Sequence, residues 1–183
     1  MYKSILCRNK NHFFVAGKST AILFLFILFL PSCFSVKYSF SGASIPSEMK
    51  TVYVAFFPNR APIVNPNLSQ QFTEALKEKF RSQTKLIVVN DIGDGNFEGE
   101  ITGYSTQPIA ITGNETAAKN RFTISVRVKY SNALDPKNNF EQTFSRYEDY
   151  DSNRSFSDVA NELVKKIIDL LIEDIYNRAF VNW

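Results

Sequence analysis

Asn120-Arg-Phe-Thr-Ile-Ser-Val-Arg-Val-Lys-Tyr130 carries the clearest secondary-structure signal in the chain. From residue 122 to residue 130, apolar side chains at even positions alternate with polar side chains at odd positions. Successive side chains of a β-strand point to opposite faces, so the alternation predicts a strand with one buried and one open face. The fold is therefore expected to contain a sheet that is covered on one side.

Further strands are expected on both sides of this one. Gly99 and Gly103 interrupt one of them, which predicts a bulge or a close backbone approach. The polar segment 106–120 is expected to be a long loop. The last strand should run antiparallel to 122–130. In chain order the additional strands are predicted at 51–57, 86–89, 97–105 and 140–147.

A first helix is predicted between the strands at 51–57 and 86–89. Asn65 suits its N-cap and Pro66 its first position, and we expect it to end near Ser82. A strand, helix, strand unit of this kind favours a parallel strand pair. The apolar face repeats every four residues at Leu68, Phe72, Leu76 and Phe80.

A second helix is predicted from Ser155 or Ser157 to about Phe180. Projected at 100° per residue, its apolar positions cover about 220°, although about 100° is enough to cover a core. Either this helix sinks deeply into its own sheet or one flank meets another protein or lipid. The residues predicted to contact a partner are Ile168, Ile172, Ile175, Phe180 and Trp183. The element order predicts an α+β fold, with one mixed sheet of about four to five strands and two helices packed on one face.

The N-terminal region predicts an export signal. Ten apolar residues, 21–30, are too few to span a bilayer, and four cations but no anion precede Cys33. Leu30-Pro-Ser-Cys33 resembles a bacterial lipobox, in which the cysteine is acylated, for example with palmitate, and the chain is cut before it. We therefore expect a signal peptide at 1–32, a lipidated tether at 33–48 and a domain at 49–183. An ordinary signal peptide with a chance cysteine is the alternative.

Removing the signal changes the charge balance. Of 21 Lys and Arg the signal holds four, which leaves 17 against 18 Asp and Glu. This near-neutral chain gives no support for nucleic-acid binding. The only histidine, His12, and the second cysteine, Cys7, lie in the signal, so histidine-based catalysis, zinc sites and disulfides are excluded from the mature chain. We expect no enzyme, no cofactor and no metal; calcium at 91–96 and catalysis by Glu98 and Glu100 are disfavoured alternatives.

These features together resemble a known family. A lipobox precedes a small domain of this element order, the strand 120–130 is followed by an aromatic strand at 140–150, and the chain closes with Glu173-Asp-Ile-Tyr-Asn-Arg-Ala-Phe-Val-Asn-Trp183. The combination is similar to the lipopolysaccharide-assembly lipoprotein family LptE, in the branch found in Bacteroidetes-like bacteria. The resemblance covers about residues 30–183.

The resemblance implies a lipid-anchored protein on the periplasmic side of the outer membrane. It would plug the large LptD β-barrel, assist its assembly and bind lipopolysaccharide during insertion into the outer leaflet, without catalysis. A generic lipid-anchored binding or structural module of the envelope is the alternative. Because lipopolysaccharide carries phosphates, its ligands should be cations. The candidates are Lys119, Arg121, Arg127 and Lys129, although the loop 106–120 has no cation before Lys119, whereas better-studied relatives carry one there.

Overall fold

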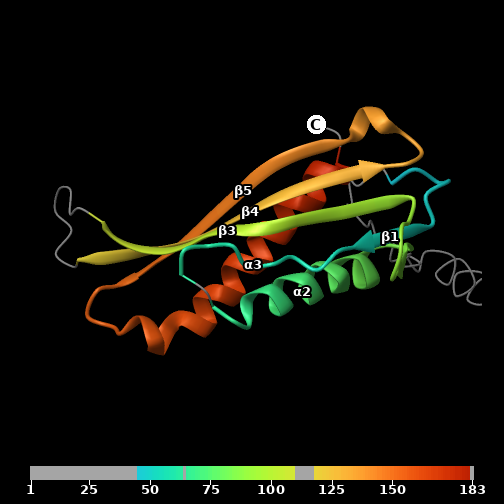
Figure 1. Ribbon diagram of the computed structural model, residues 1–183. Helices are drawn as coiled ribbons and strands as arrows, with labels where there is room; N and C mark the ends of the chain where they lie inside the picture. The colour runs from blue at the N-terminus through green and yellow to red at the C-terminus, as the bar shows by residue number, and fades with distance from the viewer. Residues whose placement is uncertain (1–44, 64, 110–117, 182–183) are drawn as a thin grey trace, which may run out of the picture. The chain divides into compact units, whose positions relative to one another are not determined.

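One mixed sheet with two helices on one of its faces forms the domain, as Figure 1 shows for the computed structural model. The structure describes residues 45–63, 65–109 and 118–181. The sheet order is β2-β1-β3-β4-β5, which confirms the predicted α+β architecture. The elements are β1 (Thr51–Val54), α2 (Leu68–Gln83), β2 (Ile87–Val89), β3 (Gly95–Ile109), β4 (Lys119–Asn132), the 3-10 turn η1 (Pro136–Asn138), β5 (Phe140–Asp151) and α3 (Phe156–Phe180).

The strand directions follow the order of the chain. β1 pairs in parallel with β2 on one side and with β3 on the other, so the predicted parallel pair around the first helix is confirmed. β3, β4 and β5 form an antiparallel meander, with the last pair antiparallel as predicted. The start of β1, the β4–β5 turn and the end of α3 lie at one end of the sheet, and the end of β3 and the start of β4 lie at the other (Figure 1).

The β3–β4 hairpin is longer than the sequence predicted. Pairing continues through Thr106 opposite Phe122 to Ile109 opposite Lys119. The prediction of a loop over 106–120 is therefore wrong for both ends of that segment, and residues 110–117 lie outside the described part of the chain. Polar residues such as Thr106 and Gln107 extend β3 because β4 offers hydrogen-bond partners along its whole length, a tertiary effect that local propensity does not contain.

Gly99 and Gly103 of β3 have the roles that the sequence indicated. A Cβ on Gly99 would lie 2.0 Å from the carbonyl oxygen of Arg127 and 2.8 Å from the ring of Phe57, so only glycine fits there. The pairing register shifts between Ile101 and Gly103, which is a bulge. Both the predicted close approach and the predicted bulge are confirmed.

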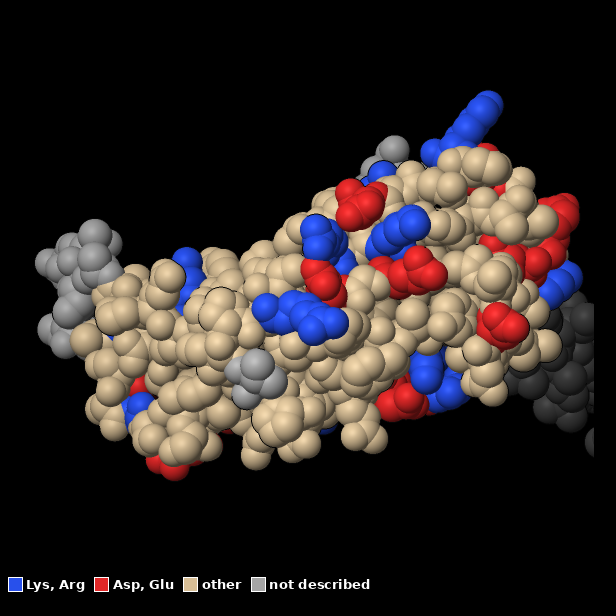
Figure 2. Space-filling model, viewed as in Figure 1, with Lys and Arg blue, Asp and Glu red and all other residues tan. Residues whose placement is uncertain are grey.

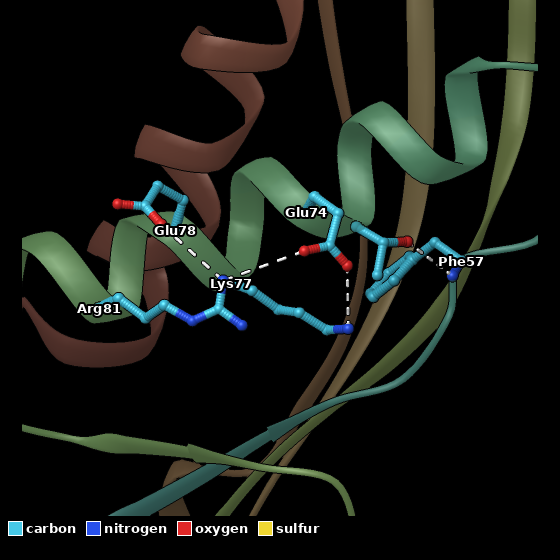
Figure 3. Close-up of polar contacts among 6 residues, drawn as sticks. Phe57, Glu74, Lys77, Glu78 and Arg81 are labelled. Carbon is cyan, nitrogen blue, oxygen red and sulfur yellow. Dashed lines mark hydrogen bonds and ion pairs between the residues drawn. The ribbon is translucent and has the colours of Figure 1, made fainter.

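The segment after β1 continues along β3 and anchors α2. Phe57 is fully buried against Phe72, whereas Phe56 is 62% exposed, so the alternation of β1 ends before the expected residue 57. The backbone N–H of Phe57 donates to the Thr73 hydroxyl at 3.1 Å (Figure 3). On the outer side of α2 the carboxylate of Glu74 pairs with the amine of Lys77 at 3.1 Å, as Figure 3 also shows. One face of α2 is therefore fixed in the core while the other remains in solvent.

The helix α2 begins two residues later than predicted. Asn67 occupies the N-cap position, and Pro66 lies in a preceding turn. The Asn65 side-chain oxygen accepts a hydrogen bond from the backbone N–H of Asn67 at 3.1 Å, so Asn65 closes this turn instead of capping the helix. The predicted buried face is confirmed: Leu68, Phe72, Leu76 and Phe80 are fully buried.

Two aromatic clusters hold the ends of the domain. Near the start of β3, ring centroids lie 5.0 Å apart for Phe80 and Phe97 and 4.7 Å apart for Phe97 and Tyr130, and Phe180 packs against all three rings. Burial raises the pKa of Tyr130 to about 12. The second cluster joins the distal hairpin to the beginning of α3 through Tyr104, Phe122, Tyr150 and Phe156.

The wide apolar arc of α3 is explained by the core of the domain itself. Ile168, Ile172, Ile175 and Phe180 are each at most 4% exposed, so these side chains leave no surface for a second protein. The partner-contact interpretation of these four residues is therefore corrected, and Trp183 lies outside the described residues. The ten buried positions of α3 are Val159, Leu163, Val164, Ile167, Ile168, Leu171, Ile172, Ile175, Tyr176 and Phe180.

These positions form a narrow stripe that winds around α3. They recur every four residues, and four residues turn the helix about 40° beyond one full turn. At its beginning α3 contacts the sheet, where Phe156 meets Phe122, and towards its end it also contacts α2, where Tyr176 meets Phe80. Phe180 still packs against the sheet there. A helical-wheel projection superimposes the buried directions of all turns. The apolar arc of α3 therefore looks wide in projection, although each single turn buries only an arc of ordinary width.

Candidate functional site

Three of the four predicted cations lie on the face of the sheet opposite the helices. Along β4 the even residues from Phe122 to Tyr130 are buried in the core, and the odd residues form the other surface. Arg121, Arg127 and Lys129 are odd and share this open face, whereas Lys119, at the end of the strand, lines a cleft that α3 also borders. Cross-strand hydroxyls lie between them, with the Ser125 and Ser145 oxygens 2.9 Å apart. Along β4 the open face is therefore polar.

Arg127 and Lys129 are paired with carboxylates of β3. The guanidinium of Arg127 donates to the carboxylate of Glu100. The amine of Lys129 lies 4.0 Å from the carboxylate of Glu98. Glu141 of β5 stands opposite Lys129 and lines the same shallow hollow above Gly99. Both cations are thus partly neutralised within the domain.

Arg121 is held in a fixed orientation. Its guanidinium donates two hydrogen bonds to the carboxylate of Asp149, at 2.8 and 2.9 Å, and lies 3.6 Å from the centroid of the Tyr147 ring. These hydrogen bonds lower the pKa of Asp149 and raise the pKa of Arg121. A bidentate, stacked guanidinium loses little entropy on ligand contact, but an anionic ligand must compete with Asp149.

Lys119 differs from the other three cations because it makes no ion pair within the described residues. It lines a cleft of about 200 Å³ between the end of β5 and the beginning of α3, together with Arg154 and Lys166. Arg154 also makes no ion pair in this part of the chain, whereas Lys166 pairs with Glu162 at 2.8 Å. Carboxylates of Glu148, Asp149, Asp151 and Glu162 complete the polar lining.

The four cations therefore form two separate pairs. Six residues of strand separate Arg121 from Arg127, which corresponds to about 20 Å. Five carboxylates on the same face lie opposite or beside them, namely Glu98, Glu100, Glu141, Asp149 and Asp151. In Figure 2 positive and negative side chains are interspersed over the visible side of the domain. This pattern favours local, directed contacts with an anion over attraction by a large basic field.

Sequence reasoning missed several members of this surface. Glu98 and Glu100 were considered only as a disfavoured catalytic pair, yet they are the partners of two predicted cations. Arg154 was not a candidate, although it shares a cleft with Lys119. The strand register could have revealed these partners, because opposite charges on neighbouring antiparallel strands pair when they stand directly opposite each other. Cys33 lies outside the described residues.

Two further properties concern the described part of the chain only. Neither α2 nor α3 combines the length and the apolar content that a membrane-crossing helix needs. Within residues 45–63, 65–109 and 118–181, no group of three or more metal-ligating side chains is close enough to hold a metal ion.

Comparison with known proteins identifies one family. The family model LptE, described as lipopolysaccharide-assembly, matches residues 49–179. No curated protein matches the sequence. Similar solved structures include the hypothetical protein CT253 from Chlamydia trachomatis, with a TM-score of 0.49, 12% identity, and coverage of 73% of this chain and 99% of that one. The rare lipoprotein B from Shewanella oneidensis has a TM-score of 0.42, 10% identity, and coverage of 69% and 89%.

Proposed function

Since this chain belongs to the lipopolysaccharide-assembly family LptE, we propose that it is an outer-membrane lipoprotein that fills the lumen of an LptD-type β-barrel and binds lipopolysaccharide. The family match over residues 49–179 is the observation that carries the proposal. The role makes and breaks no covalent bond.

The dimensions of the sheet support the proposed plug. β4 contains 14 residues, which span about 45 Å. The hydrocarbon core of a bilayer is about 30 Å thick. A domain tethered at the end where β1 begins would therefore carry the β3–β4 hairpin most of the way across the membrane if a barrel enclosed it.

The chemistry of the open face also supports a barrel partner. The inner wall of a large membrane barrel is polar, because lumen-facing and lipid-facing side chains alternate along its strands. Hydroxyls such as Ser125 and paired charges such as Arg127 and Glu100 suit that wall better than they suit lipid. This replaces the apolar flank of α3 as the proposed contact surface.

Co-purification tests the plug. The tagged full-length lipoprotein should bring down a large outer-membrane barrel in nearly equal amount. A tagged charge-reversal variant of the open face, Glu100→Lys, should recover less barrel. If the lipoprotein reaches the membrane and no barrel accompanies it, the alternative of a generic lipid-anchored envelope module is correct.

We propose Cys33 as the lipid attachment site. Several acyl chains on one residue give stable anchoring, whereas a single chain gives only marginal binding. Cys33→Ser should release the protein from the membrane or leave it unprocessed, as fractionation and intact mass would show. Unchanged mass and membrane association in that variant would contradict lipidation.

Among the four candidate cations, Lys119 is the one we propose to contact a lipopolysaccharide phosphate first, with Arg154 beside it. Lys119→Glu should weaken binding of purified lipopolysaccharide by about tenfold, the effect of losing one charge-assisted hydrogen bond and adding a like charge. Lys165→Glu is the matched control, because Lys165 is exposed on α3 and outside this cleft.

A second pair of variants tests Arg127 and Lys129. The double variant Arg127→Glu/Lys129→Glu removes both charges, whereas Arg127→Glu/Glu100→Arg exchanges the partners and keeps an ion pair at the same position. Loss of binding in the first with retention in the second would assign Lys129, and loss in both would assign Arg127. Unchanged binding in both would remove this end of the sheet as a phosphate site.

A further inference from the structure

The strand β5 is a long and regular edge of the sheet. It contains 12 residues, and every residue from Phe140 to Asp151 is paired with β4 without a register shift. β2, at the other edge, contains only three residues. In the part of the chain that the structure describes, no strand pairs with the outer side of β5.

β5 lacks most devices that close an edge against other strands. Natural edges are blunted by proline, by a bulge, by shortness, by charged side chains (lysine above all), or by a helix or loop that covers them. Residues 140–151 contain no proline, no glycine and no lysine. The exposed residues of the strand are Glu141, Gln142, Thr143, Ser145, Arg146, Tyr147, Asp149 and Asp151.

A groove runs beside this edge. Five consecutive residues of β5, 142–146, line one wall, so the groove follows the backbone and is not restricted to one face of the strand. Asp174, Asn177 and Arg178 of α3 form the other wall, and the open space is about 460 Å³. An extended peptide placed there would have β5 on one side and polar helix side chains on the other.

The charge of β5 selects the kind of strand that could pair with it. The strand carries four carboxylates and one cation, Arg146, whose charge is matched by Asp174. Glu141, Glu148 and Asp151 make no ion pair within residues 45–63, 65–109 and 118–181, whereas Asp149 is paired with Arg121. Unpaired negative charge therefore lies at both ends of the edge.

Self-association through this edge is disfavoured. In an antiparallel pair of two β5 strands aligned over residues 141–151, Glu141 of one copy faces Asp151 of the other, at both ends. Like charges directly opposite each other destabilise a strand pair. A basic strand in the same place would instead gain an opposite-charge pair at each of these positions.

We propose that the outer edge of β5 binds an extended, basic segment of another polypeptide, which adds a sixth strand to the sheet. Main-chain hydrogen bonds to β5 would give affinity, and Glu141 and Asp151, whose side chains share one face of the sheet, would select lysine or arginine at the positions opposite them. The proposal goes beyond the plug role and does not depend on it, because the segment is defined by its chemistry.

The test uses the processed full-length lipoprotein in nonionic detergent and a short peptide in which lysine alternates with valine. Fluorescence anisotropy measures binding, and hydrogen exchange of the backbone amides locates it. We expect the peptide to slow exchange within residues 140–151 and not within β2. A peptide of the same length that alternates glutamate with valine should bind at least about tenfold more weakly.

The variant Glu141→Lys/Asp151→Lys should lower the affinity for the lysine peptide about tenfold, because two favourable cross-strand pairs become repulsive. The control Glu48→Lys/Asp169→Lys makes the same charge change at exposed positions away from β5 and should bind normally. Unfolding temperatures of both variants verify that each is folded.

Three results would overturn the proposal. Peptide binding without slower exchange in β5 would place the site elsewhere. Protection of β5 without peptide that rises with protein concentration would identify a second copy as the occupant, and protection independent of concentration would identify a segment of the same chain. None of these measurements involves the barrel or lipopolysaccharide, so failure here leaves the proposed plug role intact.

Discussion

The guanidinium of Arg146 on β5 donates two hydrogen bonds, of 2.5 and 2.6 Å, to the carboxylate of Asp174 on α3. These bonds raise the pKa of Arg146. The two residues are 28 positions apart in the chain, and their contact joins the edge strand to the helix beneath it. This ion pair adds a polar contact to the apolar packing between α3 and the sheet.

A double-mutant cycle should give this pair a modest coupling energy. The Arg146 side chain is 48% exposed and the Asp174 side chain 27%, so solvent screens the attraction. For Arg146→Ala and Asp174→Ala we expect a coupling of about 1 kcal/mol, at the upper end for exposed pairs because the geometry is bidentate. Urea unfolding of the four proteins measures it, and a coupling indistinguishable from zero would contradict the prediction.

Gly99→Ala should destabilise the domain severely, by roughly 3 kcal/mol or more, because the new methyl group would overlap the Arg127 carbonyl oxygen in the adjacent strand. Gly103→Ala is the matched control. There the nearest atoms are Cβ and Oγ of Ser125, both at 3.0 Å. Oγ can rotate away and Cβ needs a shift of only a few tenths of an ångström, so we expect a smaller loss than at Gly99. Equal unfolding free energies for the two variants would show that the strands separate easily at Gly99.

Truncation on α3 distinguishes a core residue from a partner contact. Ile172→Ala should lower the free energy of unfolding of the isolated protein by about 2–5 kcal/mol, because Ile172 is 4% exposed and its removal leaves a cavity. Leu170→Ala, at a position 41% exposed on the same helix, should cost less than about 1 kcal/mol. If Ile172→Ala lowered the free energy of unfolding of the isolated protein only slightly, Ile172 would again be a candidate for contact with a partner.

Asp94 should make the free energy of unfolding depend on pH in the acidic range. Its carboxylate accepts hydrogen bonds from the backbone N–H of Lys50, the backbone N–H of Thr51 and the Thr51 hydroxyl, which lower its pKa. A lowered pKa in the folded state adds stability that is complete above the ordinary aspartate pKa of about 3.9 and is lost as the pH falls through the folded value.

The variant Asp94→Asn checks this dependence. It should be less stable than the wild type at neutral pH, and the difference between the two should shrink as the pH falls below about 4. Chemical unfolding at a series of pH values measures the difference. A constant difference down to the lowest pH would show that the carboxylate charge contributes nothing at this site.

The elements with a strong local pattern were predictable. The alternation from Phe122 to Tyr130 gave the central strand and its open face, and the four-residue spacing from Leu68 to Phe80 gave the buried face of α2. Gly99 and Gly103 marked a close approach and a bulge. In each case the information lies within a few neighbouring residues, so no knowledge of the partner strand was needed.

Properties that depend on alignment between distant segments were not predictable. The ends of β3 and β4 follow from their mutual pairing, and the partners of Arg121 and Arg127 follow from the register of three strands. The flank of α3 that carries Ile168 was misassigned because a wheel projection ignores winding along a long helix. The sequence therefore indicated the open face on which Arg121, Arg127 and Lys129 lie, but not the carboxylates that pair with them.

The aromatic cluster near the start of β3 has a consequence for the order of folding. Phe80, Phe97 and Tyr130 are spread over the middle of the chain, and Phe180 completes their packing. In a nascent chain whose α3 has not yet been synthesised, Phe180 cannot cover these three rings. The aromatic cluster can therefore be completed only after the C-terminal segment has been synthesised. Until then the uncovered rings expose the nascent chain to proteases and to aggregation, which chaperones prevent.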